Sequence, residues 1–222
     1  MTVADTTCFA FDRLTPRERY KILIGTVVPR PIAFVTTVDK AGAVNAAPYS
    51  FFNCLSADPA IVALGVEYRK DGTSKDTARN IADTGVFTVN IVSDAVLEAM
   101  NVCAVPFPPG IDELAAAGLT PVAGARVASP RIAECPAALE CRHYQTLHIG
   151  RSREIILGEV LCVHLRSGIV DPKTLHVDPA GLDAIGRMGG HGYIRTRDSF
   201  DLPTMTVGEY AARTGHQPAI TK

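Results

Sequence analysis

The sequence lacks the features that mark membrane, secreted or nucleic-acid-binding proteins. No apolar run in its 222 residues approaches the roughly 20 residues that a membrane-spanning helix needs. The polar start MTVADTT has no secretory signal character. The formal net charge is -1 and the basic residues are scattered, so electrostatics gives no reason to expect nucleic acid or an anionic membrane surface as a partner. A cytoplasmic location is the resulting expectation.

The six cysteines include no C-x-x-C pair, and a chain of this length does not need disulfide bonds to be stable. We therefore expect mostly reduced, buried thiols. Apolar residues make up 47% of the chain and charged residues 20%, which is the composition of a soluble globular protein with a full core. The length favours a single domain over residues 1–222.

Strand signals dominate the order of elements. Runs rich in β-branched residues and bounded by Gly, Asp or Pro predict strands at 31–38, 44 to about 53, 61–68, 86–92, 137–149 and 153–166. Short helices are expected at about 15–24, 74–82, 94–102 and 112–117, with a last helix starting near 206. Thr15, Pro16 and Glu18 form a capping-box pattern at the first helix, and Ser74 is the expected cap of the second.

This order favours a mainly β fold with short helices, arranged as an antiparallel barrel or sandwich, because a parallel sheet would need longer helices between its strands. Residues 106–124 are rich in Pro and Gly and resemble an insertion that covers an edge or a cavity. Residues 168–222 form a loop-rich C-terminal extension. Within it, the glycine-rich stretch 186–192 is expected to be a loop, because it follows no clear strand and opens no convincing helix.

The most informative stretch is PRPIAFVTTVDKAGAVNAAPYSFFN at 29–53, which predicts two strands joined by a turn at Asp39-Lys40-Ala41-Gly42. Pro48 is expected to break the second strand. That break would leave backbone N–H groups free from Ser50 through Asn53, beside the aromatic Phe51 and Phe52. Free donors beside aromatic rings suit a flat ligand that is rich in heteroatoms.

A second candidate is the segment Lys75-Asp76-Thr77, with Asn80 one turn later. At a helix start, unpaired N–H groups and the positive dipole end favour a phosphate, and Lys75 adds a charge. The alternative is that KDTARN is only a solvated helix face. Arg30 lies between two prolines, and it either reaches an anion or ends a strand at the surface. Thr36 and Thr37 point to opposite faces of a strand, so only one can line a given site.

Other motifs carry less weight. The 186–192 stretch could carry Met188, His191 or Tyr193 over a ligand without being a dinucleotide fingerprint. The residues Cys141, His143 and His148 provide no second tight pair, so no metal site is expected. No G-x-S-x-G elbow surrounds Ser50, and the acidic residues are dispersed, so hydrolase and paired-carboxylate chemistry are not favoured.

The combination of RPIAFVTTVDKAGAVNAAPYSFFN, KDTARNI and TGVFTVNIV resembles the flavin-reductase-like family of FMN-binding split β-barrels. That family includes flavoredoxins and the reductase components of two-component monooxygenases. The likeness covers about residues 15–166, and GRMGGHGYIRT at 186–196 also looks like a family element. The resemblance implies an antiparallel split β-barrel of Greek-key type, a homodimer, and FMN rather than FAD as the cofactor.

The resemblance also implies a role for each candidate residue. Pro48, Tyr49, Ser50, Phe51 and Asn53 would lie along the flavin ring, with Thr36 and Thr37 near the ring or ribityl chain, Lys75, Thr77, Asn80 and Arg30 at the phosphate, and His191 and Tyr193 contributed by the partner chain. This chain departs from relatives in two modest ways. Thr37 often appears as serine in them, and Tyr49 often appears as phenylalanine.

The activity implied is hydride or electron transfer from NAD(P)H to the flavin, with no catalytic side chain because the flavin carries the chemistry. The electron acceptor would be a monooxygenase or another electron-accepting protein. Two alternatives remain at this point. The chain could be a non-catalytic FMN-binding or sensing module that acts through a protein partner, or a plain structural barrel.

Overall fold

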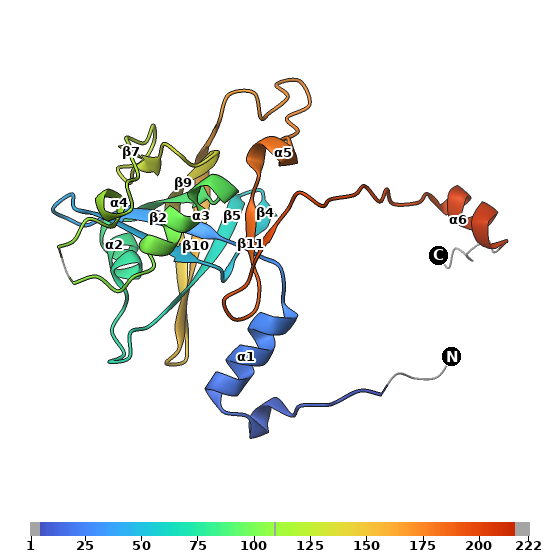
Figure 1. Cartoon of the computed structure of the whole chain (residues 1–222), viewed down its shortest axis with the longest axis horizontal. Coiled ribbons are helices and arrows are strands. Elements are labelled where there is room, and N and C mark those ends of the chain that lie inside the picture. The colour runs from blue at the N-terminus through green and yellow to red at the C-terminus, as the bar shows by residue number, and fades with distance from the viewer. Residues whose placement is uncertain (1–4, 109, 216–222) are drawn as a thin grey trace.

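The computed structural model describes residues 5–108 and 110–215, and it is mainly β with short helices (Figure 1). The strands are β1 (Arg30–Pro31), β2 (Ala33–Val38), β3 (Val44–Tyr49), β4 (Phe52–Ala57), β5 (Ala60–Glu67), β6 (Val86–Ile91), β7 (Pro121–Val122), β8 (Arg131–Ile132), β9 (Ala137–Ile149), β10 (Arg153–Leu165), β11 (Ile185–Arg187) and β12 (Tyr193–Arg195). The helices are α1 (Pro16–Thr26), α2 (Asp76–Thr84), α3 (Leu97–Val102), α4 (Glu113–Ala116), α5 (Pro179–Leu182) and α6 (Val207–Thr214), with 3-10 turns η1 (Phe11–Arg13) and η2 (Asp94–Val96).

Seven strands form one sheet in the order β3-β2-β6-β9-β10-β5-β4, and every neighbouring pair is antiparallel. The edge strands β3 and β4 lie at opposite ends of this order, yet only Ser50 and Phe51 separate them in the chain. The sheet therefore has to curl until its two edges approach each other, as a barrel does. The edges do not pair, so the barrel stays split, and the expected split-barrel fold is confirmed.

Strand β2 lies at the centre of the packing, because all six of its residues are buried. Phe34 faces one hydrophobic cluster, which includes Met100 of α3 and Leu114 of α4. Val35 faces a second cluster inside the barrel, which includes Ile81 of α2. A strand that is covered on both faces reads as a continuous apolar run, which agrees with the sequence AFVTTV.

Most helices begin where their capping residues predict. Thr15 accepts from the N–H of Glu18, whose carboxylate accepts from the N–H of Thr15, so the capping box of α1 is confirmed. The prediction for α2 was wrong in one detail: Lys75 is its N-cap and makes no side-chain cap bond. Ser74 instead donates to Glu154 Oε1 at 3.2 Å.

The expected strand break at Pro48 was also wrong. Strand β3 continues through Pro48, which lies opposite Phe34 of β2, and it ends at Tyr49. The proline is tolerated because β3 is an edge strand, where the missing N–H removes no bond from a second neighbour. The true break is the bend at Ser50 and Phe51.

The stretch 186–192, expected to be a loop, is part of a β-hairpin. Strand β11 pairs with β12, and it also pairs with β1, placing Arg187 opposite Arg30. These strands have only two or three residues, which is too short for a period-two pattern to be recognised. The hairpin is held by a partner strand more than 150 positions away in the chain.

The expected insertion covers an edge. Helix α4 begins after Asp112, whose carboxylate caps it, and Glu113 Oε2 accepts from the N–H of Ala46 on edge strand β3 at 3.3 Å. The residues that follow β12 leave the body, and α6 lies apart from the barrel (Figure 1). Among residues 5–108 and 110–215, no helix has the length and apolar character needed to cross a bilayer.

Candidate functional site

The bend between β3 and β4 presents two backbone donors. Among the described residues, no acceptor bonds the N–H of Ser50 or of Phe51, although the Phe51 carbonyl accepts from the N–H of Gly65 at 2.7 Å. Both residues are half-buried. Backbone N–H groups of partly buried residues normally have a partner, so this pair marks a place where a ligand can supply acceptors.

One cavity, which we call the β4 groove, lies on one side of this bend. It has a volume of about 380 Å³ and is lined by Leu23, Ile24, Val27, Pro29, Arg30, Pro31, Ser50, Phe51, Phe52, Asn53, Ala63, Gly65, Arg153 and Ile155. Most of these side chains are apolar. They come from α1, β1, β4, β5 and β10, so the groove lies between the first helix and the edge of the barrel.

Phe51 sits in the middle of a stack at the β4 groove. The Tyr20 ring of α1 stacks on it with 6.3 Å between ring centroids and an angle of 19°. The Arg153 guanidinium lies 3.9 Å from the Phe51 ring centroid. Gly65 permits this arrangement, because a Cβ atom there would lie only 2.9 Å from Phe51 Cβ.

A second cavity, which we call the hairpin cavity, has a volume of about 420 Å³. It is lined by Tyr20, Ile24, Arg30, Ile32, Pro48, Tyr49, Ser50, Met100, Asn101, Ala104, Arg187, Gly190, His191 and Tyr193. Ser50 and Arg30 line both cavities, so the two spaces adjoin at the bend. Six candidates from the sequence meet here: Arg30, Pro48, Tyr49, Ser50, His191 and Tyr193.

Three other candidates connect α2 to the sheet. Thr77 Oγ1 accepts from the Tyr49 hydroxyl at 2.9 Å, and Asn80 Nδ2 donates to Thr37 Oγ1 at 3.1 Å. All four residues are buried. Burial raises the pKa of Tyr49 to about 12, so its hydroxyl keeps its proton and can donate. Tyr49 thereby joins the bend at Ser50 to the start of α2.

Lys75 lies at the surface of this helix start. Its Nζ atom is 2.9 Å from Glu67 Oε1, and both side chains are partly exposed. Asp76 follows at the first helical position and forms ion pairs with Arg69 and Arg79. Because α2 has no side-chain cap, its first N–H groups remain available to an anion.

The remaining candidates lie apart from these contacts. Thr36 is fully buried on the opposite face of β2, and its hydroxyl donates to the Pro130 carbonyl, so it reaches neither cavity. Asn53 lies on the exposed side of the β4 groove, and its Oδ1 accepts from the N–H of Cys54. Thr36 and Thr37 thus face opposite sides of the strand, as their spacing predicts.

Arg30 was expected either to reach an anion or to lie at the surface, and the surface position was wrong. It is 8% exposed rather than at the surface, and it donates to the carbonyls of Ile24 and Val27, both at 2.7 Å, and of Met188 at 3.0 Å. It therefore ties the end of α1 to the β11–β12 hairpin. Its position on the wall of both cavities leaves it close to any bound ligand.

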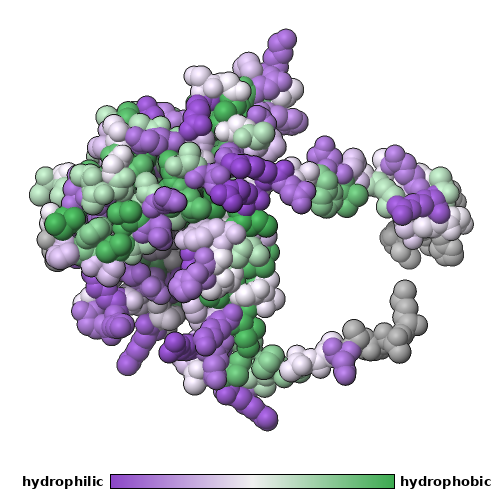
Figure 2. All heavy atoms as spheres, in the orientation of Figure 1, coloured by the Kyte–Doolittle hydropathy of each residue, from purple (hydrophilic) through white to green (hydrophobic). Residues whose placement is uncertain are grey.

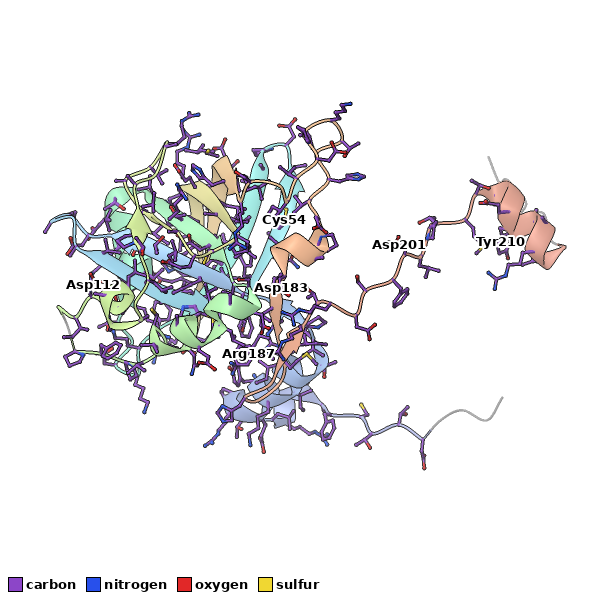
Figure 3. The ribbon with its side chains drawn as sticks, turned by 45° about the horizontal axis from the view of Figure 1, so that its top comes forward. Cys54, Asp112, Asp183, Arg187, Asp201 and Tyr210 are labelled. Atoms are coloured by element: carbon purple, nitrogen blue, oxygen red, sulfur yellow. The ribbon has the colours of Figure 1, made fainter. Side chains whose placement is uncertain are left out.

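Sequence reasoning missed Arg187, Met100 and Asn101, which line the hairpin cavity. Arg187 lies within the GRMGGHGY motif beside His191, and that motif was the available signal. A loop in this position does not predict a role for Arg187, because the position of its side chain depends on the pairing of β11 with β1. Figure 3 shows Arg187 on the hairpin where it meets α1.

One group of possible metal ligands lies elsewhere, on β9 and β10: Glu140, Cys162 and His164 have donor atoms within 4.8 Å of one another. The sequence predicted no metal site among Cys141, His143 and His148. Burial alone would raise the pKa of Glu140, but hydrogen bonds from Ala125, His164, Arg126 and Val127 hold it below the usual range. This carboxylate is already occupied in holding the 124–127 loop.

Comparison with known proteins places the chain. The family model described as "Flavin reductase like domain" matches residues 24–182. The chain belongs to this flavin-reductase-like family. The matched range contains the bend, the start of α2 and the lining of the β4 groove except Leu23. It ends before β11, so Arg187, His191 and Tyr193 lie beyond it.

Individual relatives agree with this membership. An uncharacterized protein of Deinococcus radiodurans is 48% identical over an alignment of 211 residues, and the match covers 92% of this chain and 92% of that one. The structure of nitrilotriacetate monooxygenase component B from Bacillus cereus matches with a TM-score of 0.86 at 30% identity, covering 90% of this chain and 100% of that one. The 2-nitrobenzoate 2-nitroreductase NbaA of Pseudomonas fluorescens matches with a TM-score of 0.83 at 34% identity, covering 90% and 97%. The family and these neighbours imply a flavin-related oxidoreductase.

Proposed function

We propose that this protein binds FMN and transfers hydride to it from NAD(P)H. The observation that carries the proposal is the pair of unpaired N–H groups at Ser50 and Phe51, beside the apolar β4 groove. The pyrimidine edge of a flavin carries two carbonyl acceptors, on either side of one N–H donor, at the end of a flat ring system. A groove with two available backbone donors at its rim and mostly apolar walls fits that ligand.

In this proposal the residues from Ser50 to Asn53 hold the ring, with Pro48 and Tyr49 behind them. Lys75 and the free N–H groups at the start of α2 hold the phosphate. Thr77, Asn80 and Thr37 keep α2 against the sheet, and Tyr49 fixes its distance from the bend. Thr36 acts from behind the site, through the packing of β2, and Arg30 holds the end of α1 at the wall of the groove.

A bound flavin supplies the redox chemistry, because its ring accepts hydride from a reduced nicotinamide. The protein then has to orient two flat rings in contact and to exclude water from them. The Tyr20–Phe51–Arg153 stack serves this purpose by fixing Phe51 at the wall of the groove. No dedicated general acid or base is required by this reaction.

The active form is proposed to be a homodimer. Apolar side chains are exposed along α1 and the neighbouring edge strand, among them Leu23 at 44%, Val27 at 58% and Leu55 at 60%. Figure 2 shows apolar residues gathered over this side of the body, facing the two terminal segments. A second copy would cover this surface and the β4 groove that opens on it. His191 and Tyr193 would then act in the partner's site or in their own.

The names of the structural neighbours suggest two kinds of electron acceptor. One neighbour is a monooxygenase component and another reduces a nitroaromatic acid. A separate monooxygenase that receives reduced flavin is the acceptor proposed here. Direct reduction of a small aromatic acceptor is the second candidate, favoured by the 34% identity to the nitroreductase.

Steady-state oxidation of NADH and NADPH by the purified protein, with and without added FMN or FAD, tests the reductase proposal. Oxidation that depends on FMN supports it. Protein that binds FMN but oxidises neither nicotinamide contradicts it and favours the non-catalytic binding module. Protein that binds no flavin contradicts the flavin site itself.

A further inference from the structure

The hairpin cavity carries charge of one sign. Its described lining residues include Arg30, Arg187 and His191, and they include no aspartate or glutamate. Cationic side chains on protein surfaces usually have carboxylates nearby. A cavity that is lined by two guanidinium groups and by no carboxylate is a place where an anion is stabilised.

Of the two arginines, Arg30 gives the stronger evidence for an anion site. It is more than nine-tenths buried, its three acceptors are neutral carbonyls, and its Nε atom is buried without a hydrogen-bond partner among the described residues. Burial lowers its pKa, and the nearby charge of Arg187 lowers it further. A desolvated charge without an opposite charge is costly, and an anion in the adjoining cavity would offset that cost.

Arg187 is the half-buried partner in this pair. It lies opposite Arg30 in the β1–β11 register, its guanidinium sits 4.5 Å from the Tyr193 ring centroid, and one nitrogen donates to the Gly190 carbonyl at 2.6 Å. No ion pair is found for it in the described parts of the chain. Stacking on Tyr193 fixes the direction of its remaining donors.

Arginines just downstream on the same segment behave differently. Arg195 Nε lies 2.9 Å from Asp94 Oδ2, and Arg197 pairs with both Asp94 and Asp183 at 2.8 Å. Arg195 and Arg197, which hold the hairpin to η2 and α5, are thus each paired with a carboxylate. Within the described part of the chain, Arg187 is not paired in this way. Figure 3 shows Asp183 on this side of the hairpin, away from the Arg187 end.

Part of the remaining cavity wall is apolar. Ile32 and Met100 are buried, and Ile24 and Ala104 continue the same surface. Asn101 adds a polar group near them. The cavity thus matches a ligand with a flat apolar body and an oxyanion at one end. At about 420 Å³ it has room for one aromatic ring system with its charged group.

We propose that the hairpin cavity binds the second substrate of the flavin reaction through an oxyanion held by Arg187 and Arg30, with a phosphate of NAD(P)H as that oxyanion. The inference rests on the proposed function. Since Ser50 lines both cavities, a ligand in the hairpin cavity adjoins one in the β4 groove, which is the contact that hydride transfer needs. An aromatic carboxylate acceptor would offer the same chemistry to the two arginines.

The test compares R187Q, R187K and the control R195Q with the wild-type protein. Arg195 is an arginine of the same hairpin that is already paired with a carboxylate. We expect R187Q to raise the KM for NADPH or NADH about tenfold or more, as loss of a charge-assisted hydrogen bond does. FMN affinity and kcat at saturation should be retained, R187K should recover part of the loss, and R195Q should behave like the wild type.

Binding without turnover separates this inference from the function. Calorimetry on the flavin-free protein, with adenosine 2′,5′-bisphosphate and with benzoate as probes, should show affinity that R187Q loses. Loss for the bisphosphate identifies a phosphate ligand, and loss for benzoate alone identifies a carboxylate acceptor. If Arg187-dependent binding persists in a protein that oxidises no nicotinamide, the anion site stands and the reductase proposal fails. Unchanged binding of both probes, or a loss of FMN affinity in R187Q, would overturn the inference.

Discussion

Replacing Lys75 with alanine tests where the flavin phosphate lies. Lys75 Nζ is 2.9 Å from Glu67 Oε1, with the two side chains 36% and 54% exposed. Such a surface pair contributes about 0–1 kcal/mol, whereas a hydrogen bond from a charged group contributes about 1.5–3 kcal/mol. On FMN binding, Lys75 would exchange its ion pair with Glu67 for a hydrogen bond to the phosphate. K75A should therefore weaken FMN binding by about 1–2 kcal/mol, or about 5- to 30-fold.

Glu67 allows the opposite change to be made in the same pair. E67Q removes the carboxylate that competes with the phosphate for Lys75, so FMN binding should strengthen by up to about fivefold, the value of a surface ion pair. In the double variant the benefit of E67Q should shrink, because Lys75 is no longer present to be released. A change of opposite sign from the two partners distinguishes ligand competition from general destabilisation.

Quenching of FMN fluorescence on titration with protein measures these affinities. K40A is the matched control, because Lys40 pairs with Asp83 at 2.8 Å at the other end of α2. It should leave the Kd unchanged. The reasoning is refuted if K75A binds FMN as the wild type does, or if K40A loses as much affinity as K75A.

Two further predictions concern the stability of the fold and the wall of the β4 groove. E140Q should lower the free energy of unfolding in urea at pH 7 by about 2–3 kcal/mol, because three backbone N–H groups and His164 lose a charged acceptor. Since the folded pKa of Glu140 is lowered, this difference from the wild type should be present above the unfolded pKa of about 4.3 and disappear as the pH falls through the folded value; a constant difference would contradict it. G65A should displace Phe51 and weaken FMN binding. The control is G25A, whose added Cβ meets nothing within 4 Å; it should stabilise α1 by about 0.5–1 kcal/mol without changing FMN affinity. Equal FMN affinities in G65A and G25A would contradict the role of Phe51 in the groove wall.

Local patterns predicted the elements that depend on local sequence. The capping box at Thr15 and the long apolar alternation of β9 and β10 gave elements close to those observed, with β9 matching its predicted limits. The strand break was expected at Pro48, whereas the bend begins two residues further along, at Ser50. Proline alone indicates a strand end, and it does not reveal that the strand is an edge strand.

The parts that were missed depend on contacts between distant segments. Strand β11 of the β11–β12 hairpin pairs with the distant strand β1, with Arg187 opposite Arg30. A strand of three residues is too short for any periodicity to indicate this pairing. Likewise, Arg30 was expected at the surface or at an anion, and its three carbonyl partners come from α1, from the segment that follows it and from the hairpin. The two-cavity arrangement around Ser50 follows from these long-range contacts.

The most direct measurement is the absorbance spectrum of the purified, FMN-loaded protein before and after anaerobic addition of NADH or NADPH. The account predicts an oxidised flavin spectrum that stays with the protein through gel filtration and is bleached by at least one of the two nicotinamides. A protein that retains no flavin, or one whose flavin band is unchanged by both nicotinamides, would contradict the proposal that this chain is an NAD(P)H-dependent flavin oxidoreductase.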